Sequence, residues 1–386
     1  MKSRALFSFL SLGMLLLQGC VSSFPVDPPS RKQWLRVIEV PPAIQTTHPE
    51  SVEVNFLDMS APMKEFVHTY APMSSPARRR LERLFDAVKY HPSIQTEYDA
   101  NATLTAEQVF NTGKGNCLAF SAMFIAMARE AGLAAYFQEV DVPPTWEQVT
   151  ANTVAQYRHV NIGIQFPGGD RVVDFRMDRY KETYPRRRIS DREATAHYYS
   201  NIGMENLVEG DLASAFIRMK LAIENAPDHP YFWTNMGIIQ RRLGNPDLAE
   251  ISYLRALYLD KYNYSAMSNL SILYDDQHKY ELAKQLRELS DQSKLKNPYY
   301  RYALAQNAYR SGDYNDALQL LDYAVRRRSN EHKFYFLRGL SLQALGHSDE
   351  AINDVKKAIK LTDKEFEEST AERYQIQLQE WLSSRS

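Results

Sequence analysis

The sequence predicts an α+β domain followed by an all-α array of repeated helix pairs. One very apolar helix precedes alternating strands and a hairpin turn between residues 117 and 175, which is typical of an α+β arrangement. Beyond residue 196, small residues recur every 34 positions, which is typical of stacked helical repeats. With 386 residues, 44% hydrophobic and 24% charged, the chain is long enough for both parts to have a core.

The first 20 residues have the pattern of a processing signal rather than of a folded element. Lys2 and Arg4 precede an apolar stretch, Ala5 to Leu17, that is too short to span a bilayer comfortably. The segment Leu17-Gln18-Gly19-Cys20 resembles a bacterial lipobox. An ordinary secretory signal with a chance cysteine is the alternative interpretation.

The lipobox resemblance implies that residues 1–19 are removed and that Cys20 carries lipid such as palmitate. Each buried CH2 contributes about 0.8 kcal/mol, so more than one chain makes a stable anchor. Val21 rather than aspartate follows the cysteine, which in this resemblance implies an outer-membrane location facing the periplasm. Residues 20–33, with prolines among serine and aspartate, are expected to form a tether.

Cysteine count and net charge limit the possible functions. The chain has two cysteines, and with Cys20 lipidated Cys117 has no second cysteine for a disulfide, so a disulfide scaffold is excluded. A buried, inert cysteine remains the structural alternative for Cys117. The formal net charge of −1 gives no field that favours nucleic acid, so no nucleic-acid partner is predicted.

The cysteine domain is expected to cover residues 34–190. It should open with two short strands, Trp34 to Val40 and Val52 to Leu57, and a helix from Ala77 to Val88. Thr105 to Gln108 has the pattern of a capping box that opens a short helix.

The second half of this domain is expected to place a buried helix before a sheet. The run from Leu118 to Ala128 is apolar on almost every face and ends near Gly132. A strand over Ala134 to Val142 should follow, and then a strand from His159 to Phe166 with one polar face. The sequence Pro-Gly-Gly-Asp at 167–170 predicts a hairpin turn before a return strand.

Residues 196–366 are predicted to form five repeats of two antiparallel helices. Four columns of residues, mostly small, keep one 34-residue register, and they include Gly203, Gly210, Ala215 and Ala222 with their successors. In the column of Gly210 one glycine is replaced by His278. This pattern resembles the tetratricopeptide repeat, which implies a groove that binds a protein or peptide. Residues 367–386 should contain an amphipathic helix that caps the array.

Three residues form the candidate catalytic group. Cys117 lies at the first turn of the buried helix, where the helix dipole and the N–H groups favour a thiolate and could hold an oxyanion. His159 lies on the polar face of its strand, and Asp174 lies on the return strand. The order of Cys, His and Asp is that of a papain-type site.

The segments GKGNCLAFSAMFIAMAREAGL, RHVNIGIQF and RVVDF resemble the three motifs of the transglutaminase-like superfamily, over about residues 60–185. The resemblance implies that Cys117 is the nucleophile, that His159 is the general base and acid, and that Asp174 orients His159. It implies no metal ion and no organic cofactor.

Strand geometry leaves open which of two aspartates orients His159. A two-residue hairpin loop at Gly168-Gly169 would pair His159 with Asp178 and put Asp174 opposite Gly163. Asp174 would then lie about 13 Å along the strand from His159, on the same face, unless a bulge or twist shortens the gap. Asp174 is the first choice from the family spacing, and Asp178 is the second.

Other residues have weaker functional interpretations. Gln108 and Asn111 precede the cysteine at a spacing that suits an oxyanion side chain, but both could be surface residues. Trp146 could line the cleft or pack in the core. The run Arg186 to Arg188 could bind an acidic partner or form a solvated linker face.

These features predict an envelope lipoprotein with a thiol-dependent acyl-transfer site, either a peptidase or a transamidating enzyme. Its repeats are expected to recruit an envelope protein or peptide as partner or substrate. The alternative is a non-catalytic scaffold in which the repeats are the working part.

Overall fold

The computed structural model describes residues 29–42, 44, 54–91, 94, 96–140, 146–150, 153–156, 159–175, 184–362 and 368–383. The predicted signal, Cys20, Asp178 and the side chain of Trp146 lie outside the described residues. Within the described residues, no helix has the length and apolar character needed to cross a membrane.

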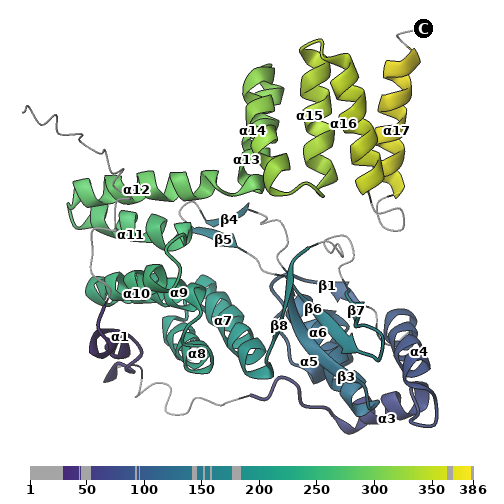
Figure 1. Cartoon of the computed structure of the whole chain (residues 1–386). Helices are drawn as coiled ribbons and strands as arrows, with labels where there is room; N and C mark the ends of the chain where they lie inside the picture. The colour runs from purple at the N-terminus through teal and green to yellow at the C-terminus, as the bar shows by residue number, and fades with distance from the viewer. Residues whose placement is uncertain are drawn as a thin grey trace, which may run out of the picture.

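The first half of the chain is an α+β domain in which helices cover a sheet (Figure 1). Its helices are α3 (Ala61–Tyr70), α4 (Ala77–Tyr90), α5 (Ala106–Thr112) and α6 (Cys117–Glu130). Its strands are β1 (Glu97–Tyr98), β2 (Lys114–Gly115), β3 (Ala134–Val140), β4 (Trp146–Thr150), β5 (Thr153–Gln156), β6 (His159–Gln165), β7 (Arg171–Val173) and β8 (Arg186–Ile189). The main sheet has the order β7-β6-β3-β8 with antiparallel neighbours.

Helix α6 is the centre of this domain. All its residues from Leu118 to Ala128 are buried, which confirms the predicted core helix. Asn116 caps its start, because the side-chain oxygen accepts a hydrogen bond from the Ala119 N–H at 3.0 Å. Gly132 follows the helix with a φ of 69°, the left-handed conformation that ends many helices.

The register of the β6–β7 hairpin differs from the one expected from a loop at Gly168-Gly169. The Gly169 N–H donates to the Phe166 carbonyl at 3.2 Å, so the turn centres on Pro167 and Gly168 instead. Proline followed by a glycine at a φ of 103° suits a type II turn. Moving the centre by one residue shifts the pairing by two, and Ile162 faces Val173.

The two strands predicted at the start of the domain do not form in the described residues, so both predictions are wrong. Residues 31–37 form a helix, α1 (Arg31–Val37), which is opened by a capping box between Ser30 and Gln33. Its Trp34 ring meets Trp233 edge-on at a centroid distance of 5.4 Å, so the segment packs on the repeats instead of joining a sheet. The described residues 54–57 also form no strand. The helix expected over Ala77 to Val88 is confirmed by α4.

The second half of the chain is an array of antiparallel helix pairs with a final helix (Figure 1). The pairs are α7 (Asp191–Glu209) with α8 (Leu212–Asn225), α9 (Pro230–Arg242) with α10 (Pro246–Leu259), α11 (Tyr264–Asp276) with α12 (Tyr280–Leu295), α13 (Pro298–Arg310) with α14 (Tyr314–Arg327), and α15 (His332–Ala344) with α16 (Ser348–Leu361). The final helix is α17 (Glu368–Ser383), whose Tyr374 ring stacks on Phe336 at 3.9 Å. These elements confirm an all-α array.

The small-residue columns have two different structural causes. The column of Gly210 lies between paired helices, where its four glycines have φ values of 78° to 87° and His278 has a φ of 61°. The column of Gly203 and Gly237 lies where helices cross closely. A Cβ on Gly237 would lie 2.4 Å from Tyr253 Cε1, so the ring or the helix would have to shift.

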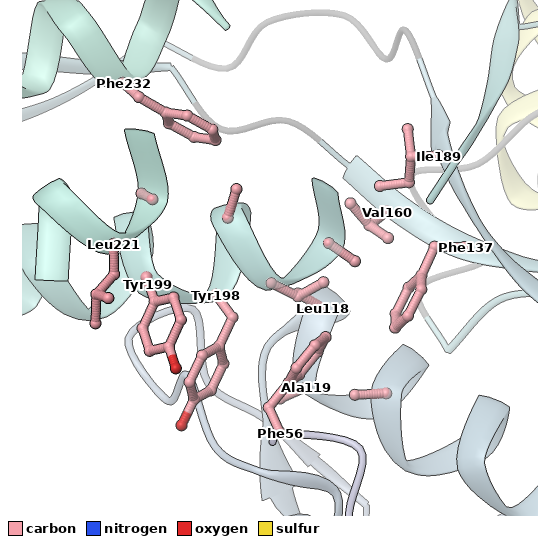
Figure 2. Packing of buried hydrophobic residues seen from close by; sticks show 14 of the residues in the cluster. Phe56, Leu118, Ala119, Phe137, Val160, Ile189, Tyr198, Tyr199, Leu221 and Phe232 are labelled. Atoms are coloured by element: carbon pink, nitrogen blue, oxygen red, sulfur yellow. The ribbon is translucent and has the colours of Figure 1, made fainter. Parts of the chain in front are cut away.

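The hydrophobic core does not divide at the predicted domain boundary. One cluster runs from the cysteine domain into the first three repeats as far as Leu286, and a second begins at Ala305 and includes Tyr374. At the junction, Tyr198 of α7 stacks on Phe56 at 5.0 Å (Figure 2). The neighbouring Tyr199 hydroxyl bonds the backbone of Val54. The first repeats and the cysteine domain therefore fold around shared side chains.

Candidate active site

Cys117 is the first residue of α6; it is reduced, and the residue is intermediate in exposure. Burial of the sulfur raises its pKa, but the hydrogen bond and the charge of His159, aided by a backbone hydrogen bond at Val160, outweigh burial. The net effect is a pKa below the ordinary value of a thiol. The position at a helix N-terminus acts in the same direction.

His159 and Asp174 form a buried pair beside this thiol. His159 is the first residue of β6 and Asp174 directly follows β7, and their exposed fractions are 5% and 4%. The His159 Nε2 lies 2.5 Å from Asp174 Oδ2. Because Nε2 faces the carboxylate, the hydrogen bond to the Cys117 thiol falls to Nδ1.

The electrostatics favour an imidazolium beside a thiolate. Burial lowers the pKa of His159, but hydrogen bonds and charge interactions with Asp174 and Cys117 more than compensate, and the pKa is raised. A raised histidine pKa and a lowered cysteine pKa describe the same ion pair. Both shifts therefore act toward a thiolate at Cys117 beside a protonated His159.

The register of the hairpin explains why Asp174 reaches His159. In the observed pairing Asp174 falls opposite Asn161, two residues from His159 on the same face, rather than opposite Gly163. Two residues along a strand are about 7 Å instead of about 13 Å, a span that the two side chains bridge. The structure thus brings Cys117, His159 and Asp174 together, whereas Asp178 lies outside the described residues.

Asn161 joins the group and is absent from the predicted set. It is 1% exposed, and its Nδ2 donates to Asp174 Oδ2 at 3.1 Å. The donor orients the carboxylate that faces His159. The signal was available, because Asn161 alternates with apolar residues on the same polar face as His159.

The two oxyanion candidates lie on α5. Gln108 completes the predicted capping box: its Oε1 accepts from the Thr105 N–H at 2.9 Å, and the side chain is exposed. Asn111 is also exposed. Gln108 therefore has a structural partner, and an oxyanion role for either residue stays a prediction.

The arginine run at 186–188 is not a linker but edge strand β8, paired with β3. Arg187 Nη2 lies 2.6 Å from Glu139 Oε2 and 2.7 Å from Glu193 Oε1, and the Arg188 guanidinium lies over the Tyr136 ring. Arg187 and Arg188 thus contact residues of the same domain, while all three arginine side chains remain exposed.

Among the described residues, Glu139, His197 and His229 are the group that could hold a metal ion. Their ligand atoms lie within 4.8 Å of one another at the junction of sheet and repeats. The Arg187 guanidinium already balances the charge of Glu139. These residues are separate from the group around Cys117.

Comparison with known families agrees with both halves of the fold. Residues 64–173 match the family model of the transglutaminase-like superfamily. Residues 230–263 match the tetratricopeptide repeat, and residues 276–358 match the anaphase-promoting complex, cyclosome, subunit 3. The chain therefore joins a transglutaminase-like domain to tetratricopeptide repeats, the class of protein that the sequence motifs predict.

Solved structures that match part of this chain include several MamA proteins and a pilF protein. A MamA crystal structure is 19% identical, with a TM-score of 0.24, and the match covers 45% of this chain and 94% of that chain. A structure of MamA from Desulfovibrio magneticus RS-1 is 19% identical, with a TM-score of 0.25 and coverages of 43% and 94%. The Pseudomonas aeruginosa pilF structure is 18% identical, with a TM-score of 0.27 and coverages of 50% and 93%. The comparison with curated proteins gives no match.

Proposed function

We propose that the chain is a thiol-dependent acyl-transfer enzyme that acts on amide bonds of envelope proteins. The observation that carries this proposal is the Cys117 thiol at the start of α6, hydrogen-bonded to the buried pair of His159 and Asp174. A lowered thiol pKa, an imidazole that can move a proton and a carboxylate that orients the imidazole are the parts that nucleophilic catalysis needs.

In the proposed reaction, the Cys117 thiolate attacks the carbonyl carbon of a substrate amide. The imidazolium of His159 gives its proton to the leaving amine, the C–N bond breaks and a thioester remains. Water then attacks the thioester with His159 as base and releases a carboxylic acid, or a second amine attacks and forms a new amide. Asp174 holds the ring and stabilises its charged form throughout. No metal ion or cofactor takes part.

The repeats are proposed to recruit the protein that carries this amide. Tetratricopeptide arrays bind proteins and have no chemistry of their own. A site and a recruiting array on one chain raise the effective concentration of a bound substrate. A lipid on Cys20, with an outer-membrane location facing the periplasm, would confine this substrate to the cell envelope; the lipobox pattern supports that part of the proposal.

The test is thiol labelling of intact envelopes that contain either wild-type chain or Cys117→Ala. Peptide-resolved mass spectrometry measures labelling at Cys117, and the same samples are searched for amide bonds that differ between the two. We expect substrate amides that are cleaved or exchanged only with the wild type. Turnover that survives in Cys117→Ala refutes the proposal.

A scaffold without catalysis is the second candidate, and the burial of the polar group favours it. His159 and Asp174 are 5% and 4% exposed, so among the described residues neither side chain is open to a substrate. In that case the repeats alone hold the partner. Capture of one envelope protein by wild type and Cys117→Ala alike, with no altered amide bond in it, would support this candidate over the enzyme.

A further inference from the structure

Asn116 links the reactive end of α6 to the loop before α5. Besides capping Ala119, its Nδ2 donates to Thr103 Oγ1 at 2.8 Å, and its N–H donates to the Ala102 carbonyl at 3.0 Å. Asn116 is 4% exposed and Thr103 is 6% exposed. A buried polar group that loses its partner is costly, so the position of this cap depends on Thr103.

The same Thr103 hydroxyl continues the chain of hydrogen bonds into the repeat array. It donates to Glu205 Oε1 at 2.6 Å, and Glu205 belongs to α7, the first helix of the repeats. The order is therefore amide N–H to hydroxyl to carboxylate, in which each member uses its preferred role. A carboxylate at the end of such a chain polarises and strengthens the bonds before it.

The environment of Glu205 fits a structural carboxylate. Burial raises its pKa, the hydrogen bonds from Thr103 act in the opposite direction, and Glu209 and Asp99 are the neighbouring charged groups. The partly buried carboxylate of Glu205 therefore connects the repeat array to the cysteine domain. Tyr198 of the same helix packs on Phe56, so the contact has an apolar support next to it (Figure 2).

We propose that Glu205 is a positioning residue of the repeat array, which holds the N-cap of α6 through Thr103 and Asn116 and so keeps the Cys117 thiol reactive. This inference rests on the proposed function of Cys117, since it concerns control of that thiol. Its consequence is that the reactivity of the thiol depends on the position of α7 relative to the cysteine domain: loss of the contact between Glu205 and Thr103 removes the support of the cap and lowers that reactivity.

The test measures the thiol itself, without any substrate. The full chain is alkylated with iodoacetamide between pH 4 and pH 10, and the rate at Cys117 is followed by peptide-resolved mass spectrometry. Thr103→Val and Glu205→Leu interrupt the chain at its two joints. Glu209→Gln is the matched control, because Glu209 is an exposed acid one turn further along α7.

We expect both interruptions to raise the apparent thiol pKa and to lower the rate at pH 7 about threefold to tenfold, the effect of a weakened N-cap. Thr103→Ser should restore the wild-type profile, because it restores the hydroxyl, and Glu209→Gln should leave the profile unchanged. The double variant should lose no more than either single variant, because both break one chain.

Several outcomes would overturn the inference. Wild-type profiles in folded Thr103→Val or Glu205→Leu would do so, and so would an equal shift in Glu209→Gln. Where thermal unfolding shows that Glu205→Leu does not fold, Glu205→Gln replaces it: it keeps an acceptor oxygen but no charge, and an unshifted profile refutes the role of the carboxylate. An ordinary thiol pKa in the wild type would instead refute the proposed function of Cys117.

Discussion

Replacement of Asp174 by asparagine should weaken the ion pair between His159 and Cys117 while keeping the shape of the site. The carboxylate lies 2.5 Å from His159 Nε2 and both groups are buried, so the interaction is a charge-assisted hydrogen bond. Such bonds contribute about 1.5–3 kcal/mol. At 1.36 kcal/mol per pKa unit, loss of this charge-assisted hydrogen bond should lower the pKa of His159 by about one to two units.

The sign for Cys117 follows from the coupling of the two groups. The hydrogen bond and the charge of His159 lower the thiol pKa, and the charge of Asp174 raises it by a smaller amount. A less basic ring therefore lets the thiol pKa rise on balance. The thiolate is lost as pH falls through the thiol pKa, and in the variant this loss begins at a higher pH. The alkylation rate of Cys117 at pH 6 should therefore fall about tenfold to a hundredfold.

The assay is the pH profile of alkylation at Cys117, with Asp170→Asn as control. Asp170 lies on the same hairpin and bonds the Tyr136 hydroxyl rather than His159, so its replacement should leave the profile of the thiol in place. Asn161 can still donate to the new amide oxygen, which preserves the local packing. A folded Asp174→Asn chain with the wild-type profile would show that the carboxylate does not set the ionisation of Cys117.

Three further predictions concern the repeats. Gly237→Ala should lower the free energy of unfolding by about 1–3 kcal/mol in a denaturant titration, because its Cβ would overlap the Tyr253 ring; an unchanged midpoint would show that the ring simply moves. His278→Gly should raise the free energy of unfolding by about 0.5–1 kcal/mol, because glycine adopts the φ of 61° at no steric cost. A loss of stability would mean that the contact of His278 with Tyr280 outweighs the backbone strain. A chain that ends after Leu295 should keep the alkylation profile of Cys117, because the later helices have a separate core. Its KM for a recruited substrate should rise far more than its kcat falls, because those helices are proposed to bind the substrate. Equal losses in both constants would count against recruitment by those helices.

The parts of the fold that the sequence predicts are those with a strong periodic signal. The 34-residue register predicts the helix pairs, and the apolar run after Cys117 predicts a buried helix, because both patterns extend over many residues. Short segments are predicted less well. Residues 34–40 contain the β-branched and apolar residues that are typical of a strand. The capping box at Ser30 and the contact of Trp34 with the repeats favour a helix instead.

The candidate site shows the same division. Cys117 and His159 are found from local motifs, whereas the pairing of His159 with Asp174 depends on which two residues make the hairpin turn. Pro167-Gly168 and Gly168-Gly169 both suit a tight turn, and only the folded chain selects between them. Contacts from distant segments, such as Glu205 with Thr103, leave no periodic signal in the sequence.

The distribution of the core changes what the repeats can do for the cysteine domain. Helix α7 supplies Tyr198 to the shared core and Glu205 to the cap of α6, so the first repeat is part of the scaffold of the site. The last two repeats and α17 have their own core, and Figure 1 shows α14 to α17 running across the direction of α11 and α12. A polar contact connects this outer part to the cysteine domain, because the Tyr184 hydroxyl lies 3.4 Å from Glu331 Oε2. Among the described residues, movement of the outer helices on a bound partner would break this polar contact and little apolar packing, whereas movement of α7 would break the contact of Glu205 with Thr103. We therefore expect the outer repeats to recruit the partner and the inner repeats to keep Cys117 in place.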